Sequence, residues 1–238
     1  MNEGMKLYYD YTVGNLGRLF YKSVEAQLSQ LKGKRILDFG SGFGFTSDFL
    51  AENNTVVAIE KDADMIEYAK NCNDYTCVNA GLEGLRNFED NSFDGVMCHL
   101  VLEFVTNQNE ILNELLRVLK PGGVLSVIRH NKNGRIVQAI VQDYDLADAE
   151  KLLDGGYSYS SAFGDIRYYT NDDLLEWCDG KIAVQDVKGI RVLASLHGAE
   201  LSAADGWLEN MLEIEGRLFN NDDFVKIAYF NHLLCVKK

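Results

Sequence analysis

The chain has 238 residues, and its hydrophobic content of 47% is enough for one large buried core. Its net charge of −13 disfavours binding to nucleic acid over a broad surface, because neutralising phosphates requires clustered Lys and Arg. Residues 1–10 lack the apolar core of a signal peptide, and no stretch is apolar for long enough to form a membrane helix. We therefore expect a cytoplasmic protein with no membrane partner.

Cysteine and histidine are scattered along the chain. The five cysteines form no Cys-x-x-Cys pair, and no Cys/His run has the spacing of a zinc site. They are Cys72, Cys77, Cys98, Cys178 and Cys235. We therefore predict reduced thiols and no metal site.

Periodicity predicts a helical N-terminal segment followed by alternating strands and helices. Apolar residues recur at three- and four-residue steps within the segment 1–32. The strands predicted after it are 35–39, 56–60, 76–79, 93–99 and 124–129, and the helices between them are 46–52, 63–71 and 109–119. Such alternation is typical of a parallel sheet covered by helices on both faces.

The last third of the sequence is less regular. Residues 136–179 are polar and aromatic, which favours inserted helical turns and loops that form a lid or a substrate-binding insertion. A strand at 188–196, a helix at 204–219 and a strand at 225–236 then close the sheet with an antiparallel strand. No proline-rich linker divides the chain, so we predict a single α/β domain over 1–238, with turn residues at 120–123.

A glycine-rich turn carries the strongest functional signal. Residues 36–44 read ILDFGSGFG, an apolar strand that runs into Gly-x-Gly-x-Gly before a helix. Glycines let the backbone approach a ligand closely, and a helix N-terminus offers free N–H groups. Asp38 precedes the first glycine by two residues, and Glu60 ends the next strand, where a carboxylate can accept both hydroxyls of a ribose. The alternative for Glu60 is an exposed acid at a strand end.

These residues resemble the class I S-adenosylmethionine-dependent methyltransferases, and the resemblance covers nearly the whole chain. Residues 38–44 resemble the first motif of that family, 79–83 the stretch beside adenine, 93–96 the fourth strand and 119–125 the turn before the fifth. The resemblance implies a Rossmann-like sheet and S-adenosyl-L-methionine as the cofactor. The dinucleotide spacing Gly-x-Gly-x-x-Gly is missing, which disfavours a dehydrogenase.

A narrower resemblance involves bacterial enzymes that methylate the carboxyl of 5-carboxymethoxyuridine at the tRNA wobble position. Segments 99–105, 130–134 and 189–192 are similar to these enzymes, and 14–18 is similar to their Gly-x-x-Arg segment but has one extra residue. The resemblance implies Arg18 at the methionine carboxylate, Gly40 and Ser41 along it, Glu60 at the ribose, Gly81 and Leu82 beside the adenine, and His99 at the methionine moiety. The predicted cofactor-binding residues also include Asp38, Gly42 and Lys61.

The role of His99 stays open from the sequence alone. A histidine at the end of a buried strand is often only a satisfied core residue. Its position four residues before Glu103 favours a functional role modestly.

Cations near the end of the fifth strand suggest an anionic acceptor. Arg129, Lys132 and Arg135 flank that strand end, and on so acidic a protein they favour an anionic partner, although such a run is usually a solvated face. We predict that Arg129, Asn131 and Arg191 bind the acceptor. The tRNA enzymes carry a lysine-rich segment after this strand, whereas here the segment 143–154 is acidic, which weakens tRNA as a partner. Its acids are Asp143, Asp145, Asp148, Glu150 and Asp154.

The expected activity is methyl transfer to a small-molecule or nucleoside-like anionic acceptor, with the tRNA wobble carboxyl as the most specific hypothesis. A carboxylate is already ionised at neutral pH, so we predict no catalytic base. A small-molecule O- or N-methyltransferase is the first alternative. A protein that binds S-adenosylmethionine without catalysis is the second.

Overall fold

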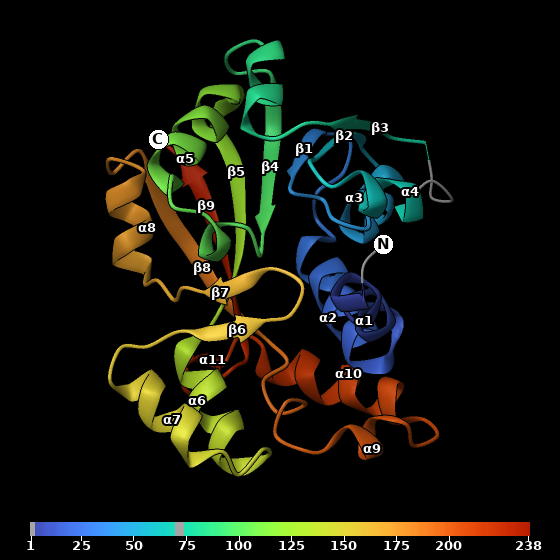
Figure 1. Ribbon diagram of the computed structural model, residues 1–238. Helices are drawn as coiled ribbons and strands as arrows, with labels where there is room; N and C mark the ends of the chain where they lie inside the picture. The colour runs from blue at the N-terminus through green and yellow to red at the C-terminus, as the bar shows by residue number, and fades with distance from the viewer. Residues whose placement is uncertain (1–2, 70–73) are drawn as a thin grey trace. The chain divides into compact units, whose positions relative to one another are not determined.

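The computed structural model describes residues 3–69 and 74–238 (Figure 1). The chain divides into two compact units. The first contains Met1–Ala26, Arg129–Tyr168 and Val187–His232, and the second contains Gln27–Ile128, Tyr169–Asp186 and Leu233–Lys238. The expected N-terminal segment lies mostly in the first unit, and the expected lid is shared between the two.

Most of a seven-stranded sheet belongs to the second unit, and the ends of some of its strands belong to the first. Its order is β3-β2-β1-β4-β5-β9-β8. The strands are β1 (Arg35–Phe39), β2 (Thr55–Glu60), β3 (Thr76–Asn79), β4 (Phe93–His99), β5 (Leu119–His130), β8 (Ile182–Ile190) and β9 (Phe230–Lys237). The first five are parallel, and the C-terminal strand is antiparallel, as the sequence predicted.

The strand order determines where a ligand can bind. From β1 the chain proceeds outward to β2 and β3, and β4 then returns to the other side of β1. In open α/β sheets the crevice at this switch point, at the carboxyl ends of the strands, is the usual ligand site. Ile36 and Leu37 in β1 and Val96 and Met97 in β4 are fully buried, so the centre of the sheet is covered on both faces.

Helices surround the sheet in the second unit. They are α3 (Phe45–Ala51), α4 (Ala63–Ala69), η1 (Leu82–Asn87), η2 (Leu102–Phe104), α5 (Gln108–Val118) and α8 (Asn171–Trp177). The longest, α5, buries Ile111, Leu112, Leu115 and Leu116, and this spacing is the apolar stripe of an amphipathic helix. The predicted helix 63–71 is confirmed as far as Ala69. Residues 70–73, which include Cys72, lie outside the described part.

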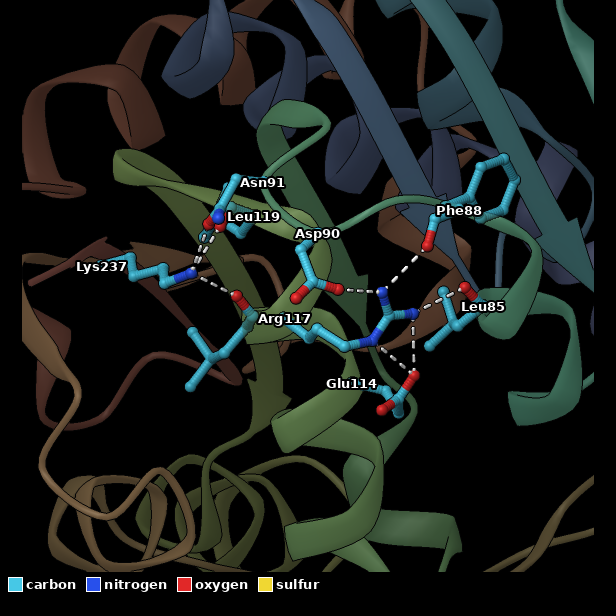
Figure 2. A network of polar contacts seen from close by, with 9 residues as sticks. Leu85, Phe88, Asp90, Asn91, Glu114, Arg117, Leu119 and Lys237 are labelled. Atoms are coloured by element: carbon cyan, nitrogen blue, oxygen red, sulfur yellow. Dashed lines mark hydrogen bonds and ion pairs between the residues drawn. The ribbon is translucent and has the colours of Figure 1, made fainter.

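Polar side chains bind the end of α5 to its surroundings (Figure 2). The Arg117 guanidinium donates to Asp90 at 2.7 Å and to Glu114 at 3.0 Å. Lys237, the second-last residue, donates from Nζ to Asn91 Oδ1 at 2.9 Å and to two backbone carbonyls at 2.7 Å. Because the Arg117 side chain is 27% exposed and makes several charge-assisted bonds, this network contributes more to the free energy of unfolding than an isolated surface ion pair does.

The first unit is mainly helical. Its elements are α1 (Glu3–Val13), α2 (Asn15–Leu28), α6 (Lys132–Val141), α7 (Leu146–Leu153), β6 (Ser158–Ser160), β7 (Gly164–Ile166), α9 (Ala199–Ser202), α10 (Trp207–Leu218) and α11 (Asp222–Val225). Leu19 of α2 packs with Ala194 and with Trp207 and Leu208 of α10 in one buried cluster. The predicted N-terminal helical segment is two helices that separate at Gly14.

Three predicted elements differ from the structure. The strand predicted at 188–196 overlaps only the end of β8, which begins at Ile182 and ends at Ile190. It ends there because Arg191 adopts a φ of +55° and the following N–H groups bind a side chain instead of a neighbouring strand. The strand predicted at 225–236 begins at Phe230, because α11 occupies the preceding residues. The turn predicted at 120–123 lies within β5, at an irregularity in its pairing with β4.

The described residues contain neither a helix long and apolar enough to cross a membrane nor a group of three metal-binding side chains. Their four cysteines, Cys77, Cys98, Cys178 and Cys235, are free, and all but Cys77 are buried.

Candidate functional site

The glycine loop follows β1 and adopts a backbone that side chains would disturb. Gly40 and Gly42 have φ values of +73° and +56°, and Gly44, with φ +78°, is the N-cap of α3. A Cβ on Gly40 would lie 2.5 Å from Cγ2 of Val101. The sequence therefore requires glycine here both for conformation and for space, which is what a loop that closely approaches a cofactor needs.

Glu60 lies at the end of β2 and is 7% exposed. Its Oε2 accepts from the Gly42 N–H at 2.8 Å, and its Oε1 accepts from the Asp62 N–H at 2.9 Å. The alternative of an exposed acid is therefore wrong. Each carboxylate oxygen has a further lone pair, so Glu60 can still accept ribose hydroxyls. Lys61, the next residue, is exposed.

Asp38, in β1, is buried and accepts from the Ser47 hydroxyl at 2.6 Å. Burial raises the pKa of Asp38 to about 6, the Ser47 hydrogen bond opposes this rise, and the nearby Glu60 carboxylate adds to it. The contact connects β1 to α3, which begins after the glycine loop. Asp38 therefore connects the strand before the glycine loop to the helix after it. Its partner Ser47 was not predicted from the sequence.

The stretch beside the predicted adenine position follows β3. The Gly81 N–H donates to Glu83 Oε1 at 2.8 Å, and Leu82 begins the short helix η1. Asn79, at the end of β3, donates to the backbone carbonyls of Glu60 and Lys61 at 3.0 Å. The ends of β2 and β3 are therefore held together next to Glu60.

His99 ends β4, and its Nε2 lies 2.7 Å from Oγ of Ser126. Burial lowers the pKa of His99 to about 3, so the imidazole is neutral at pH 7. Leu100 follows with a φ of +54°, which is rare for a leucine and is often found at functional sites. The neutral imidazole of His99 has one donor and one acceptor nitrogen at this strand end, but it does not supply a positive charge.

The structure brings most of the predicted cofactor residues to the carboxyl ends of β1, β2, β3 and β4 in the second unit. Arg18 belongs to the first unit, where it is exposed in the first turn of α2 and donates to Asn15 Oδ1 at 3.2 Å. The glycine before it has a packing reason, because a Cβ on Gly17 would lie 2.1 Å from the Thr12 carbonyl oxygen.

Arg129 and Asn131 lie in the first unit at and just after the end of β5, and both are buried. The Asn131 amide donates to the carbonyls of Lys226 at 2.9 Å and Ala228 at 2.8 Å, and its oxygen accepts from the Asn133 N–H at 3.3 Å. This amide therefore anchors the start of α6. Any effect of Asn131 on an acceptor would come through that anchoring.

Arg191, also in the first unit, is 2% exposed. Its Nη1 donates to the Tyr11 hydroxyl, and its guanidinium lies 4.9 Å from the ring centre of Tyr229 and 5.6 Å from those of Tyr11 and Phe230. Burial lowers the pKa of Arg191 to about 10, while Tyr229 and Glu215 favour its charged form. Arg191 is therefore a buried cation at neutral pH.

Arg135 is less suited to an anionic acceptor than the sequence suggested. Its guanidinium binds Asp143 at 2.6 Å and Asp148 at 2.5 Å. Part of the acidic segment 143–154 therefore neutralises a cation of the same unit. Lys132, one turn before Arg135 in α6, is half-buried.

Two further residues of the first unit, Tyr11 and Glu215, were not predicted from the sequence. Tyr11 had no signal, because one tyrosine in a helix is unremarkable. Glu215 is 3% exposed and had a weak signal, because it continues the apolar stripe of Leu208, Met211 and Leu212 on α10. An acid at an inward-facing position indicates a buried partner.

Comparison with known proteins matches this chain to methyltransferases. A model of the methyltransferase domain matches residues 37–127. The chain is 24% identical to the tRNA 5-carboxymethoxyuridine methyltransferase of Escherichia coli K12 over 96% of this chain and 91% of that protein. It is 31% identical to the demethylmenaquinone methyltransferase of Clavibacter sepedonicus, covering 71% and 69% of the two chains.

A solved structure from Thermotoga maritima shows the same fold. It is described as a SAM-dependent methyltransferase and possible histamine N-methyltransferase, and it matches with a TM-score of 0.63 at 17% identity over 98% of this chain and 95% of that one. The glycine loop, the buried acid at the end of β2 and these relatives lead to one conclusion. The chain belongs to the S-adenosylmethionine-dependent methyltransferases.

Proposed function

We propose that this methyltransferase acts on an acceptor that carries a carboxylate, and that the carboxyl of a modified tRNA wobble uridine is the most specific candidate. The observation that supports an anionic acceptor best is Arg191, a buried cation in a protein whose net charge is −13. Support for the tRNA candidate comes from the E. coli tRNA enzyme, because the similarity extends over 96% of this chain and is not confined to residues 37–127.

The proposed contacts with S-adenosylmethionine are the cofactor residues predicted from the sequence. We propose that Gly40, Ser41 and Gly42 line it, because the loop leaves no room for side chains at Gly40. Glu60 would hold the ribose through the lone pairs that its two backbone bonds leave available. The remaining proposed contacts are Asp38 through the loop that it supports, Lys61 beside the ribose, Gly81 and Leu82 at the adenine, His99 at the methionine moiety and Arg18 at its carboxylate.

The proposed reaction needs no acid–base catalysis by the protein. When bound, S-adenosylmethionine supplies an electrophilic methyl group. A carboxylate nucleophile is already ionised at pH 7, so the residues of this chain need only bind, orient and exclude water. The neutral imidazole of His99 is consistent with a role in binding and orientation. We propose that Arg129 binds the acceptor and that the positive charge of Arg191 attracts it, with Asn131 anchoring the start of α6.

A small-molecule O- or N-methyltransferase is the second candidate. The names of the Clavibacter enzyme and the Thermotoga structure refer to small molecules, and the acidic segment 143–154 makes a long polyanion a poorer partner. Pairing of Arg135 with Asp143 and Asp148 removes one cation that RNA phosphates would need.

Transfer of a labelled methyl group from S-adenosylmethionine separates these candidates. The acceptors to compare are tRNA containing 5-carboxymethoxyuridine, the same tRNA without the modification, the free nucleoside 5-carboxymethoxyuridine and a pool of small carboxylic acids, phenols and amines. We expect labelling that is base-labile, as a methyl ester is, and that requires the carboxyl. Labelling of amines or phenols alone would contradict the proposal and favour the second candidate.

A further inference from the structure

We propose that Tyr11 contacts the carboxylate of the acceptor, and that Arg191 acts behind it as a buried cation that strengthens the Tyr11 hydroxyl as a donor. Both residues belong to the first unit. The inference rests on the proposed function, since it assigns a contact to an anionic acceptor.

The two residues are hydrogen-bonded but differ sharply in exposure. Arg191 is 2% exposed, whereas Tyr11 is 43% exposed. Arg191 donates from Nη1 to the Tyr11 hydroxyl oxygen. A ligand that arrives from solvent therefore meets the tyrosine, while the arginine is covered by it.

Arg191 lacks the compensation that a buried guanidinium normally has. Its Nε is buried and has no hydrogen-bond partner among the described residues, which also provide no ion pair to it. Arginine is rarely buried without a paired carboxylate. The rings of Tyr229 and Phe230 compensate in part through cation–π contacts, but they leave the positive charge directed toward Tyr11.

Glu215 favours the charged form of Arg191 electrostatically, but its hydrogen bonds go to the backbone and not to the guanidinium. Its carboxylate accepts from the N–H groups of Val192, Leu193 and Ala194 at 2.6, 2.9 and 2.9 Å. These bonds fix the turn that starts at Arg191, whose φ is +55°. The acid that faces this region is therefore used by the backbone, and the guanidinium stays available to Tyr11.

The Tyr11 hydroxyl can transmit the electrostatic effect of this cation to a ligand. Its oxygen accepts from Arg191, and its own O–H is left to donate. Donation from a cation polarises the phenol and makes its O–H a stronger donor, because hydrogen bonds in a chain reinforce one another. A carboxylate is the acceptor that gains most from such a donor, and it is preferred over a neutral amide of the same size.

The test compares two probes, 5-carboxymethoxyuridine and its carboxamide, by calorimetry with S-adenosylhomocysteine present. We expect the wild type to bind the carboxylate at least about tenfold more tightly, in line with the strength of one charge-assisted bond. Tyr11→Phe, which removes one oxygen and keeps the ring, should reduce that preference to about twofold or less, and Arg191→Gln should do the same. Tyr144→Phe is the matched control, because Tyr144 is 80% exposed in the same unit.

Each result bears on one of the two proposals. If Tyr11→Phe keeps the wild-type preference, Tyr11 is not the contact, although an anionic acceptor would still stand. If the wild type binds both probes equally or neither, the anionic acceptor itself is wrong, and this inference is wrong with it. Should Arg191→Gln fail to fold, Tyr11→Phe decides the matter alone. Affinity for S-adenosylhomocysteine should stay unchanged in Tyr11→Phe.

Discussion

The backbone N–H of Gly42 donates to the Glu60 carboxylate at 2.8 Å. This bond connects the end of β2 to the glycine loop that follows β1. The residue proposed to hold the ribose therefore also shapes the loop proposed to line the rest of the cofactor. A change at either position should affect both the affinity for cofactor and the stability of the unliganded protein.

Glu60→Ala should lower the affinity for S-adenosylhomocysteine at least about tenfold, because hydrogen bonds to a charged acceptor contribute about 1.5–3 kcal/mol each. Unliganded protein should also lose about 1–3 kcal/mol of unfolding free energy, since the partly buried N–H groups of Gly42 and Asp62 lose their acceptor. Calorimetry and urea unfolding measure the two effects. Glu52→Ala, at an exposed acid, is the control. An affinity within twofold of the wild type would show that Glu60 only shapes the loop.

Gly40→Ala should abolish cofactor binding and destabilise the protein by more than the about 1–2 kcal/mol that a left-handed backbone alone costs. The added Cβ would lie 2.5 Å from Val101 Cγ2. Gly33→Ala is the matched control, because Gly33 has a φ of +66° but an added Cβ there would meet nothing within 4 Å. Urea unfolding should separate the two variants, and Gly40→Ala with Val101→Ala should recover part of the loss. Equal destabilisation at both glycines would contradict the steric argument.

Asp38 should make stability fall as pH rises. Its folded-state pKa of about 6 lies above the ordinary value of 3.8, so the folded protein holds this proton more tightly. The contribution is complete below about pH 4 and is lost as pH rises through about 6, by at most about 3 kcal/mol. Asp38→Asn mimics the protonated form, so the difference in unfolding free energy between wild type and variant should follow this curve.

Urea unfolding between pH 4 and pH 7 measures that difference for Asp38. Subtracting the variant removes the titration of all other groups. Asp74→Asn, at an exposed position, should give a flat difference. A flat difference for Asp38→Asn as well would mean that Asp38 is solvated and that its burial is not maintained in solution.

The acidic segment should limit binding to RNA in two ways, through its own charge and through Arg135. Asp143→Asn with Asp148→Asn removes two carboxylates and releases Arg135 from both partners. Glu150→Gln with Asp154→Asn removes the same charge from the same segment and leaves Arg135 paired. Affinity for bulk tRNA should rise in both, but more in the first, whose salt dependence should steepen by about 0.7–0.9 for one added phosphate contact. Tight, salt-sensitive binding of bulk tRNA by the wild type would contradict this role.

Much of the second unit was predictable from sequence because its signals are local. The predicted strand 93–99 has the bounds of β4, since an apolar run between polar turns is sufficient to define a strand that is buried on both faces. Gly40 and Glu60 also stood out in the sequence, because each lies at the end of an apolar run that marks a strand locally. The predicted helix 109–119 differs from α5 by only one residue at each end.

The first unit was less predictable, because its contacts join distant residues. Tyr11 and Arg191 are 180 positions apart. Val192 and Leu193 continue an apolar run that is typical of a strand, but the Glu215 carboxylate, more than 20 residues later, captures their N–H groups and turns the chain. The neutrality of His99 likewise depends on its burial in the folded protein. Composition and periodicity contain none of this information.

The position of β9 has a consequence for synthesis on the ribosome. β9 comes last in chain order among the strands of this sheet, yet it lies between β5 and β8 and not at the edge. Until residues 230–237 have left the exit tunnel, β5 and β8 lack their common neighbour and expose unpaired backbone groups, which other chains could bind. The sheet can therefore close only after residues 230–237 have been made and released. A chain that ended before residue 230 would lack the strand that joins the parallel part to β8, along with Lys237, which bonds to the end of α5.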